Sequence, residues 1–346
     1  MKSTVFASIR EGSGKTSVIV GIMSALKKNI GYVKPIGDRL IYKRKRNRDY
    51  DSHLVTALFN LPEDAENITL GFDHSKLRYM YDHESVGMAV NDLVELTAQG
   101  KDGVFIEAGK DIFYGSSLNL DPLSLARHTR SSLVLIVDGS DESILDDLTF
   151  AKNNFDLNGI PSCAIIINKV FDRVEFQELY SDRIESLGFD ILGILPHEER
   201  LTKFTISYLA QRFFAKVVAG EAGIGNMVDN VFVGAMSTDE IIRNPLFNKK
   251  NKFLITSGDR TDMILSALEG DTAGVLLTNN ILPPSNIISK ANDRNIPLLL
   301  VSMDTFTAAM KFGEMETLLT RDNEEVVGML AQLAEKYLKL DSFFSS

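Results

Sequence analysis

Residues 5–17 read VFASIREGSGKTS: an apolar run, a glycine-containing loop and the start of a helical pattern that continues to residue 28. A phosphate-binding loop requires this order of strand, glycine loop and helix. Gly12 and Gly14 would let main-chain amides approach phosphate oxygens, and the helix N-terminus would add a favourable dipole. Lys15 would contact the β- and γ-phosphates of a nucleotide, and the Thr16 hydroxyl would bind Mg²⁺. The segment predicts a nucleotide site formed by Gly12, Ser13, Gly14, Lys15, Thr16 and Ser17.

One position in this loop departs from the simple motif. Glycine is expected five places before Gly14, and Ile9 stands there. An ordinary glycine turn before a helix is the alternative interpretation. The GSGKTS run lies correctly between a strand and a helix, which favours the phosphate loop.

The order of elements predicts an α/β fold: a P-loop NTPase-type parallel sheet flanked by helices, followed by a smaller α/β domain. Residues 30–35 form a second apolar run, so strand, loop, helix and strand give a βαβ unit. The runs 103–107, 133–138 and 164–168 are apolar until a final polar residue, which is typical of strands covered on both faces. Another strand is predicted at 191–195.

A glycine-rich stretch at 219–226 lacks apolar periodicity and predicts a linker over 218–228. The nucleotide-binding domain would then span 1–217 and the smaller domain 229–346. In the second domain we expect strands at 231–235, 253–256, 274–277 and 297–301, helices at 262–268 and 284–292, and a C-terminal helix at about 324–338.

Composition limits the class of protein. The chain has 346 residues with 37 basic and 47 acidic side chains, a net charge of −10, which argues against general nucleic-acid binding. Its single cysteine, Cys163, cannot form an internal disulfide, and it is expected to be a buried small residue rather than a reactive thiol. The N-terminus does not resemble a signal peptide and no apolar run is long enough to cross a bilayer, so we expect a cytoplasmic protein.

Three further segments carry candidate charges for chemistry on phosphate. Lys34 ends a strand beside the loop strand and could stabilise charge on a phosphoryl group or carboxylate, although alone it would be a solvated strand-end residue. Asp51, with Asp49 in reserve, could complete a magnesium shell. Glu107 ends an apolar strand in a Walker-B-like pattern that would place a carboxylate beside the metal, and a mere strand-end charge is the alternative.

Asn168 ends the run 164–168. Its amide both donates and accepts hydrogen bonds, so it could bind the base of a nucleotide, and it could equally cap the following turn. The residues leave these two roles open.

Taken together, these segments resemble dethiobiotin synthetase and the cobyrinic acid a,c-diamide synthase type of P-loop protein. That family has a longer loop spacing, and its leading glycine falls on Ser8. Residues 32–35 (YVKP) resemble the family's strand-end lysine motif with Val33 inserted, and residues 107–109 (EAG) resemble a shortened form of its acidic element. Residues 168–170 (NKV) match its base-binding segment. The resemblance implies ATP and Mg²⁺ as cofactors, with Thr16, Asp51 and Glu107 holding the metal and Lys15 and Lys34 contacting phosphates.

The C-terminal part resembles a DRTGG domain through residues 233–237 and 258–260, and less well through 276–280, where Asn279 and Asn280 replace two glycines. The combination is similar to the N-terminal half of long bacterial phosphotransacetylases. The family resemblance also implies a homodimer.

Two functions follow as hypotheses. The chain could be an ATP-dependent ligase that phosphorylates a small carboxylate bound near Lys34 and Arg39. Alternatively, it could be a nucleotide sensor whose DRTGG-like domain reports to a partner with little or no turnover.

Overall fold

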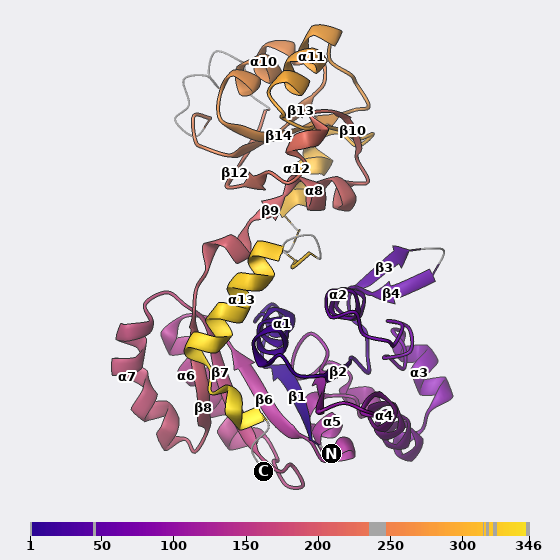
Figure 1. Ribbon diagram of the computed structural model, residues 1–346, viewed down its shortest axis with the longest axis vertical. Coiled ribbons are helices and arrows are strands. Elements are labelled where there is room, and N and C mark those ends of the chain that lie inside the picture. Colours follow the sequence, from indigo (N-terminus) through magenta and orange to yellow (C-terminus); the bar gives the residue numbers. More distant parts are fainter. Residues whose placement is uncertain are drawn as a thin grey trace. The chain divides into compact units, whose positions relative to one another are not determined.

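The computed structural model of the chain describes residues 2–43, 46–234, 247–313, 315, 318–320 and 324–343. These residues divide into two compact units, residues 1–198 with 319–346 and residues 199–318 (Figure 1). In the described residues, no helix is both long enough and apolar enough to span a membrane.

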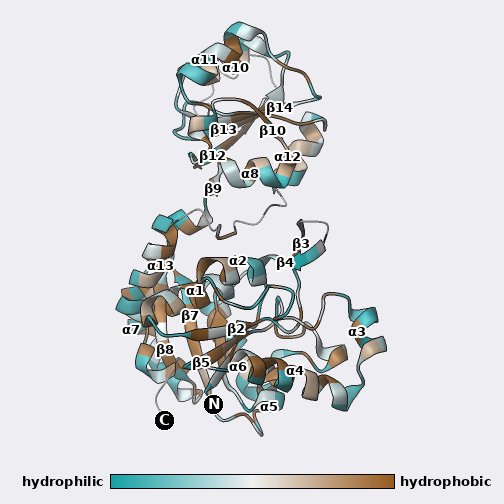
Figure 2. Ribbon diagram, turned by 45° about the vertical axis from the view of Figure 1, so that its right-hand side comes forward, coloured by the Kyte–Doolittle hydropathy of each residue, from teal (hydrophilic) through white to brown (hydrophobic). Residues whose placement is uncertain are grey.

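The first unit is built on a six-stranded sheet in which every neighbouring pair is parallel. The loop strand β1 lies in its middle, between β5 and β6. Figure 2 shows these strands in the colours of apolar residues, and β2 and β5 are buried along their whole length. Burial on both faces is the property expected of a strand covered by helices on each side. In sheet order the strands are β2 (Ile30–Val33), β5 (Gly103–Glu107), β1 (Ser3–Ser8), β6 (Ser132–Val137), β7 (Cys163–Val170) and β8 (Asp190–Pro196).

Helices pack against both faces of this sheet. Helix α1 contacts β1 and β5, while α4 contacts β5 and α5 contacts β1, so the same strands are covered from two sides. An antiparallel hairpin of β3 (Leu40–Lys43) and β4 (Arg46–Asp49) leads into α2. The helices are α1 (Lys15–Leu26), α2 (Tyr50–Leu58), α3 (His74–Met80), α4 (His83–Thr97), α5 (Pro122–Thr129), α6 (Asp141–Asn154), α7 (Arg173–Ser186) and α13 (Glu324–Tyr337), with short 3₁₀ turns at Ser116–Leu118 and Leu340–Phe343.

The second unit has a five-stranded sheet in the order β10-β15-β14-β13-β12, with β10 antiparallel at the edge. Successive residues of β13 face opposite sides: Leu254 packs with α10 and α11, and Phe253 and Ile255 pack with α8 and α12. Because alternate side chains of a strand face opposite sides of the sheet, the sheet forms one small core with each of its two helical layers. The elements are β9 (Phe204–Thr205), α8 (Ile206–Phe213), β10 (Lys216–Ala219), β11 (Met227–Val228), β12 (Asn230–Val233), β13 (Lys252–Ser257), α10 (Thr261–Glu269), β14 (Thr272–Thr278), α11 (Ser285–Asp293), β15 (Leu298–Leu300) and α12 (Thr305–Gly313), with 3₁₀ turns at Glu199–Thr202 and Glu221–Gly223.

The predicted α/β class is confirmed, and each predicted strand is present within one or two residues at its ends. The edge strand β10 of the second sheet was not predicted. Residue 235 of the expected strand 231–235, residues 235–237 of the DRTGG-like segment and residues 44–45 of the basic hairpin lie outside the described residues.

The domain boundaries differ from those predicted. The stretch expected to be a linker, 218–228, lies inside the second unit, where β10 pairs with β15 and β11 pairs with β9. Two of its three glycines serve close packing: a Cβ on Gly220 would lie 2.2 Å from the carbonyl oxygen of Ile296, and one on Gly223 would lie 2.0 Å from that of Asn295. At Gly220 and Gly223, close contact and not flexibility therefore requires glycine.

The C-terminal helix also belongs elsewhere than predicted. Helix α13 packs against α1 in the first unit, as Figure 1 shows with the yellow helix beside the indigo one. A Cβ on Gly21 would lie 2.8 Å from the carbonyl oxygen of Leu330, so the two helices approach closely at a glycine. Beyond α13, the Phe343 ring stacks on Phe6 of the central strand, with ring centroids 5.8 Å apart. The second unit is thus an insertion between the main body and the last helix of the first unit.

Candidate functional site

The loop between β1 and α1 has the backbone of a phosphate-binding loop. Gly12 and Gly14 adopt φ angles of 81° and 88°, in the left-handed region that favours glycine. A Cβ on Gly12 would meet nothing within 4 Å, whereas one on Gly14 would lie 2.6 Å from the Asn168 side-chain nitrogen. The first glycine therefore faces open space, and the second allows β7 to come close. Helix α1 begins at Lys15, so its unpaired amides face this loop.

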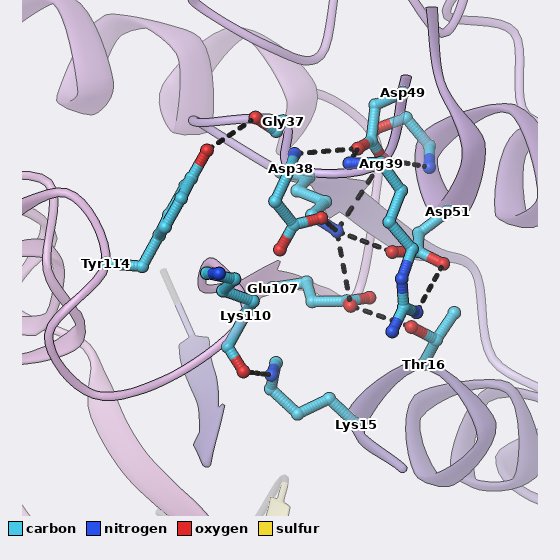
Figure 3. Close-up of polar contacts among 12 residues, drawn as sticks. Lys15, Thr16, Gly37, Asp38, Arg39, Asp49, Asp51, Glu107, Lys110 and Tyr114 are labelled. Carbon is cyan, nitrogen blue, oxygen red and sulfur yellow. Dashed lines mark hydrogen bonds and ion pairs between the residues drawn. The ribbon is translucent and has the colours of Figure 1, made fainter. Parts of the chain in front are cut away.

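Lys15 folds back over the loop and is buried. Its ammonium donates hydrogen bonds to the Ser8 hydroxyl (2.8 Å) and to the carbonyl oxygen of Lys110 (2.9 Å). Figure 3 shows the second of these bonds. Burial lowers the pKa of Lys15, and the nearby charge of Glu107 offsets this only in part. An ammonium whose contacts here are with neutral oxygens can gain from an anionic phosphate.

Two residues of β7 hold the other side of the loop. The Asn168 side-chain nitrogen donates to the Ser13 carbonyl oxygen (2.9 Å), and the Lys169 ammonium donates to the carbonyl oxygen of Gly12 (2.5 Å). Asp138, at the end of β6, accepts from the Ser13 hydroxyl (2.5 Å) and pairs with Lys169 (3.0 Å). The sequence left two roles open for Asn168, binding the nucleotide base and capping the turn that follows β7. This contact is neither of them, because the side-chain amide supports the phosphate loop.

Thr16 and Glu107 form the second part of the site. The Thr16 hydroxyl donates to Glu107 Oε1 and the Tyr32 hydroxyl donates to Oε2, each at 2.8 Å. Glu107 is fully buried, and burial raises its pKa to about 7 against the opposing charge of Lys34. A hydroxyl and a carboxylate in contact are hard oxygen donors of the kind that Mg²⁺ prefers.

Lys34 lies among four carboxylates with only 1% of its side chain exposed. Its ammonium contacts Asp51 (2.5 Å) and Asp38 (2.7 Å), and lies 3.7 Å from both Asp49 and Glu107. Burial alone would lower the pKa of Lys34, yet the surrounding carboxylates, Asp51 foremost, raise it well above its ordinary value. The ammonium is therefore held firmly in its charged form.

The two aspartates proposed for the metal have different surroundings. Asp49 caps α2 and accepts hydrogen bonds from the backbone amides of Ser52, Asp38 and Arg39 at 2.9–3.2 Å. Burial raises the pKa of Asp49. Burial would also raise that of Asp51, but Lys34 and then Arg39 outweigh this effect and lower its pKa. The Asp49 carboxylate therefore mainly accepts hydrogen bonds from backbone amides, while the Asp51 carboxylate forms ion pairs with Lys34 and Arg39.

The structure brings five of the predicted site residues together: Lys15, Thr16, Lys34, Asp51 and Glu107. Figure 3 labels four of these, Lys15, Thr16, Asp51 and Glu107. Ser17 lies in the first turn of α1. Sequence reasoning assigned no role to Tyr32, Asp38 or Lys169. The register of β2 against β5 pairs Val33 with Ile106, so Lys34 and Glu107 leave the sheet side by side.

These features define a P-loop nucleotide-binding domain. The central strand of a parallel sheet leads through two left-handed glycines and a buried lysine into a helix, and Glu107 at a neighbouring strand end contacts Thr16 in the first turn of that helix. The AAA domain family matches residues 2–205, more than half of the chain, and the chain belongs to this family. Residues 208–315 match the DRTGG domain.

The chain is similar to two proteins named phosphate acetyltransferase. It is 22% identical to that of Nitratidesulfovibrio vulgaris over 98% of this chain and 51% of the relative. It is 23% identical to that of a Synechocystis species over 94% of this chain and 49% of the relative. The chain therefore spans about half the length of these curated relatives. Among solved structures, a ParA family ATPase from Chlorobium tepidum aligns with 58% of this chain and 86% of its own chain, at 16% identity and a TM-score of 0.36.

Proposed function

We propose that this chain binds Mg-ATP at the loop 12–17 and acts as a nucleotide-responsive regulatory protein with slow turnover or none. The observation that carries the proposal is the pairing of a phosphate loop with a lysine that is already held by carboxylates. Binding is supported by the open space at Gly12 and by the Lys15 ammonium, which contacts neutral oxygens.

The donor set fits a magnesium ion. Thr16 and Glu107 are in contact, and Asp51 lies on the other side of the Lys34 ammonium. These three residues would hold the ion, which when bound would neutralise charge on the β- and γ-phosphates. Lys34 occupies the centre of the same carboxylates, so an incoming divalent cation would compete with its ammonium.

The charges around Lys34 favour regulation over ligase chemistry. A substrate carboxylate approaching this lysine would also face Asp38, Asp49 and Asp51, and like charges at such distances repel. A lysine already paired with several carboxylates has little net attraction left for an anion. In this proposal the DRTGG unit, residues 208–315, passes the nucleotide state of the first unit on to a partner.

The ligase remains the second candidate because of Arg39. Its guanidinium lies 3.9 Å from Asp51, near the end of the Lys34 side chain. If Mg²⁺ displaced Lys34 from Asp51, Lys34 and Arg39 together could bind a small carboxylate beside the γ-phosphate. The expected homodimer and the cytoplasmic location stay predictions.

The two functions are separated by measuring binding and turnover on the same protein. Calorimetry is expected to give Mg-ATP binding that Lys15→Ala weakens roughly 10- to 100-fold, since charge-assisted hydrogen bonds contribute about 1.5–3 kcal/mol. ADP release with a panel of small carboxylates is expected to stay at the level of Lys15→Ala. ADP release that rises with one carboxylate would replace the regulator by the ligase, and no binding of any purine nucleotide by the folded protein would end both.

A further inference from the structure

The carboxyl ends of β7 and β8 carry an aromatic pair that the phosphate site does not use. Phe171 and His197 stack with ring centroids 4.3 Å apart and an interplanar angle of 24°. The Phe171 side chain is nevertheless 84% exposed, although the residue before it, Val170, is in the core. A large aromatic ring with one face on a partner and most of its surface in water is available to stack a second flat group.

The backbone on both sides of Phe171 is fixed. Val170 ends β7, and its carbonyl oxygen accepts the His197 amide at 2.8 Å, which ties the two strand ends together. On the other side, Asp172 caps α7 by accepting from the amides of Val174 and Glu175, at 3.0 Å each. Phe171 is the single residue between these two anchors, so its backbone is fixed and its ring rests on His197. Such preorganisation lowers the entropic cost of binding a ligand.

The pair is continuous with the phosphate loop. Three residues before Phe171, Asn168 donates to Ser13, and Lys169 donates to Gly12. Lys169 reaches the loop by adopting a left-handed φ of 60°, a costly conformation for a lysine, which is accompanied by a register shift at the end of β7. One strand end therefore contacts the phosphate loop and then presents an exposed aromatic ring beside it. In open parallel sheets, ligands bind at this edge.

We propose that the Phe171–His197 pair is the platform on which the base of the bound nucleotide stacks. The inference rests on the nucleotide site proposed above and adds the location and nature of the base contact. The Asn168 amide nitrogen is committed to the loop, so the base is held mainly through the flat face of Phe171. The ligand class is a purine nucleoside triphosphate whose triphosphate lies on loop 12–17 and whose base lies over the ends of β7 and β8.

The test compares a ligand with a base to one without. Mg-ATP and Mg-tripolyphosphate are titrated calorimetrically into the full chain and into Phe171→Ala, Phe150→Ala and Lys15→Ala. Phe150 is the matched control because it is half exposed, lies in the same unit and also contacts one aromatic ring, Phe155. Base–aromatic stacking contributes about 1–3 kcal/mol, so Phe171→Ala should weaken ATP binding by about tenfold or more and leave tripolyphosphate binding within about twofold.

A second variant gives a direct signal. The chain has no tryptophan, so Phe171→Trp introduces a single tryptophan at the platform, whose emission can be excited apart from that of the tyrosines. It should retain ATP affinity, and its emission should change with Mg-ATP and not with Mg-tripolyphosphate.

The outcomes separate the two proposals. If Phe171→Ala binds ATP like the unaltered chain while Lys15→Ala does not, the platform is wrong and the nucleotide site stands. Equal weakening of both ligands by Phe171→Ala also overturns the platform, since the ring would then act only on the loop. If the unaltered chain binds neither ligand, the nucleotide site fails and the platform fails with it.

Discussion

A buried lysine lies at a strand end of the sheet in each unit, Lys34 in the first and Lys252 in the second, and the two have opposite surroundings. Lys34, at the end of β2, is 1% exposed and lies among four carboxylates. Lys252, at the start of β13, is 2% exposed, donates to the Asp271 carbonyl oxygen at 3.2 Å and lies over the Phe247 ring at 4.9 Å. Neighbouring carboxylates raise the pKa of Lys34, while burial lowers that of Lys252.

This difference distinguishes a charge kept for a ligand site from a charge tolerated by a fold. The carboxylates around Lys34 would repel one another without a cation, so the site requires either this ammonium or a metal. Lys252 uses its alkyl chain as core and its ammonium as a donor to the main chain. Burial of a lysine is therefore no guide to function unless its partners are known.

The largest effect is expected from Lys34→Met. It removes the cation and leaves buried carboxylates uncompensated, which should cost about 3–5 kcal/mol of unfolding free energy. Added MgCl₂ should restore part of the loss, because an ion that binds only the folded state stabilises it. Urea unfolding followed by alkylation of Cys163 measures this in the first unit, since Cys163 is partly buried there and burial raises the pKa of its thiol to about 12, so that alkylation is slower in the folded unit than in the unfolded one. A Lys34→Met protein as stable as the unaltered chain would contradict this account of the cluster.

The glycines of the two units extend the comparison. Gly258 follows β13 much as the phosphate loop follows β1, yet a Cβ on it would lie 1.7 Å from the carbonyl oxygen of Ile281. Gly258→Ala should therefore destabilise the second unit by about 1–3 kcal/mol and leave ATP affinity unchanged. Gly12→Ala should do the reverse, costing about 1 kcal/mol of stability and weakening ATP binding markedly. Thermal unfolding and calorimetry on both variants check the crossover, and a loss of ATP affinity in Gly258→Ala would break it.

Lys252→Met should change the unfolding free energy by less than about 1 kcal/mol. It removes one main-chain hydrogen bond and one cation–π contact, and it also removes the cost of burying a charge. Urea unfolding beside Lys34→Met measures the contrast. A loss as large as that of Lys34→Met would mean that the Lys252 ammonium has a binding role.

The smallest effect is a difference in alkaline pH dependence. The pKa of Lys252 is lower in the folded state than in the unfolded state, so the unfolded chain binds more protons between the two values. Lys252 therefore makes the unaltered chain gain stability as pH rises through that window, and Lys252→Met should lack this contribution. Lys34 has the opposite sign, because its pKa is raised and its contribution is lost at high pH. The measurement is the unfolding free energy of the unaltered chain and of Lys252→Met from pH 8 upward. The difference between these two proteins at each pH isolates the Lys252 contribution. A difference that does not change with pH would contradict the prediction.

The sequence predicted the strands and the phosphate loop because both are local patterns. Apolar runs that stop at Glu107 or Asn168 need no distant partner to be recognised. The stretch 218–228 was misread because glycine has the same appearance whether it supplies flexibility or close contact. Only the carbonyls of Asn295 and Ile296, more than seventy residues away, distinguish the two.

The sequence predicted the main charged residues of the candidate site, but it did not predict which of them contact one another. Lys34, Asp51 and Glu107 were found one by one, each from a strand end or loop. Tyr32 and Asp38 flank Lys34 in the chain, but their roles depend on the register of β2 with β5 and on the hairpin that returns Asp49 to the site. Such contacts are set by tertiary packing and leave no periodic signal in the sequence.

The position of α13 has a consequence for synthesis. The first unit needs this helix against α1, and the helix is translated only after all of residues 199–318. During translation, the whole second unit would therefore emerge from the ribosome before α13, while the first unit still lacks its last helix. The second unit can therefore complete its folding before the first unit, although its residues are synthesised later than most of the first unit.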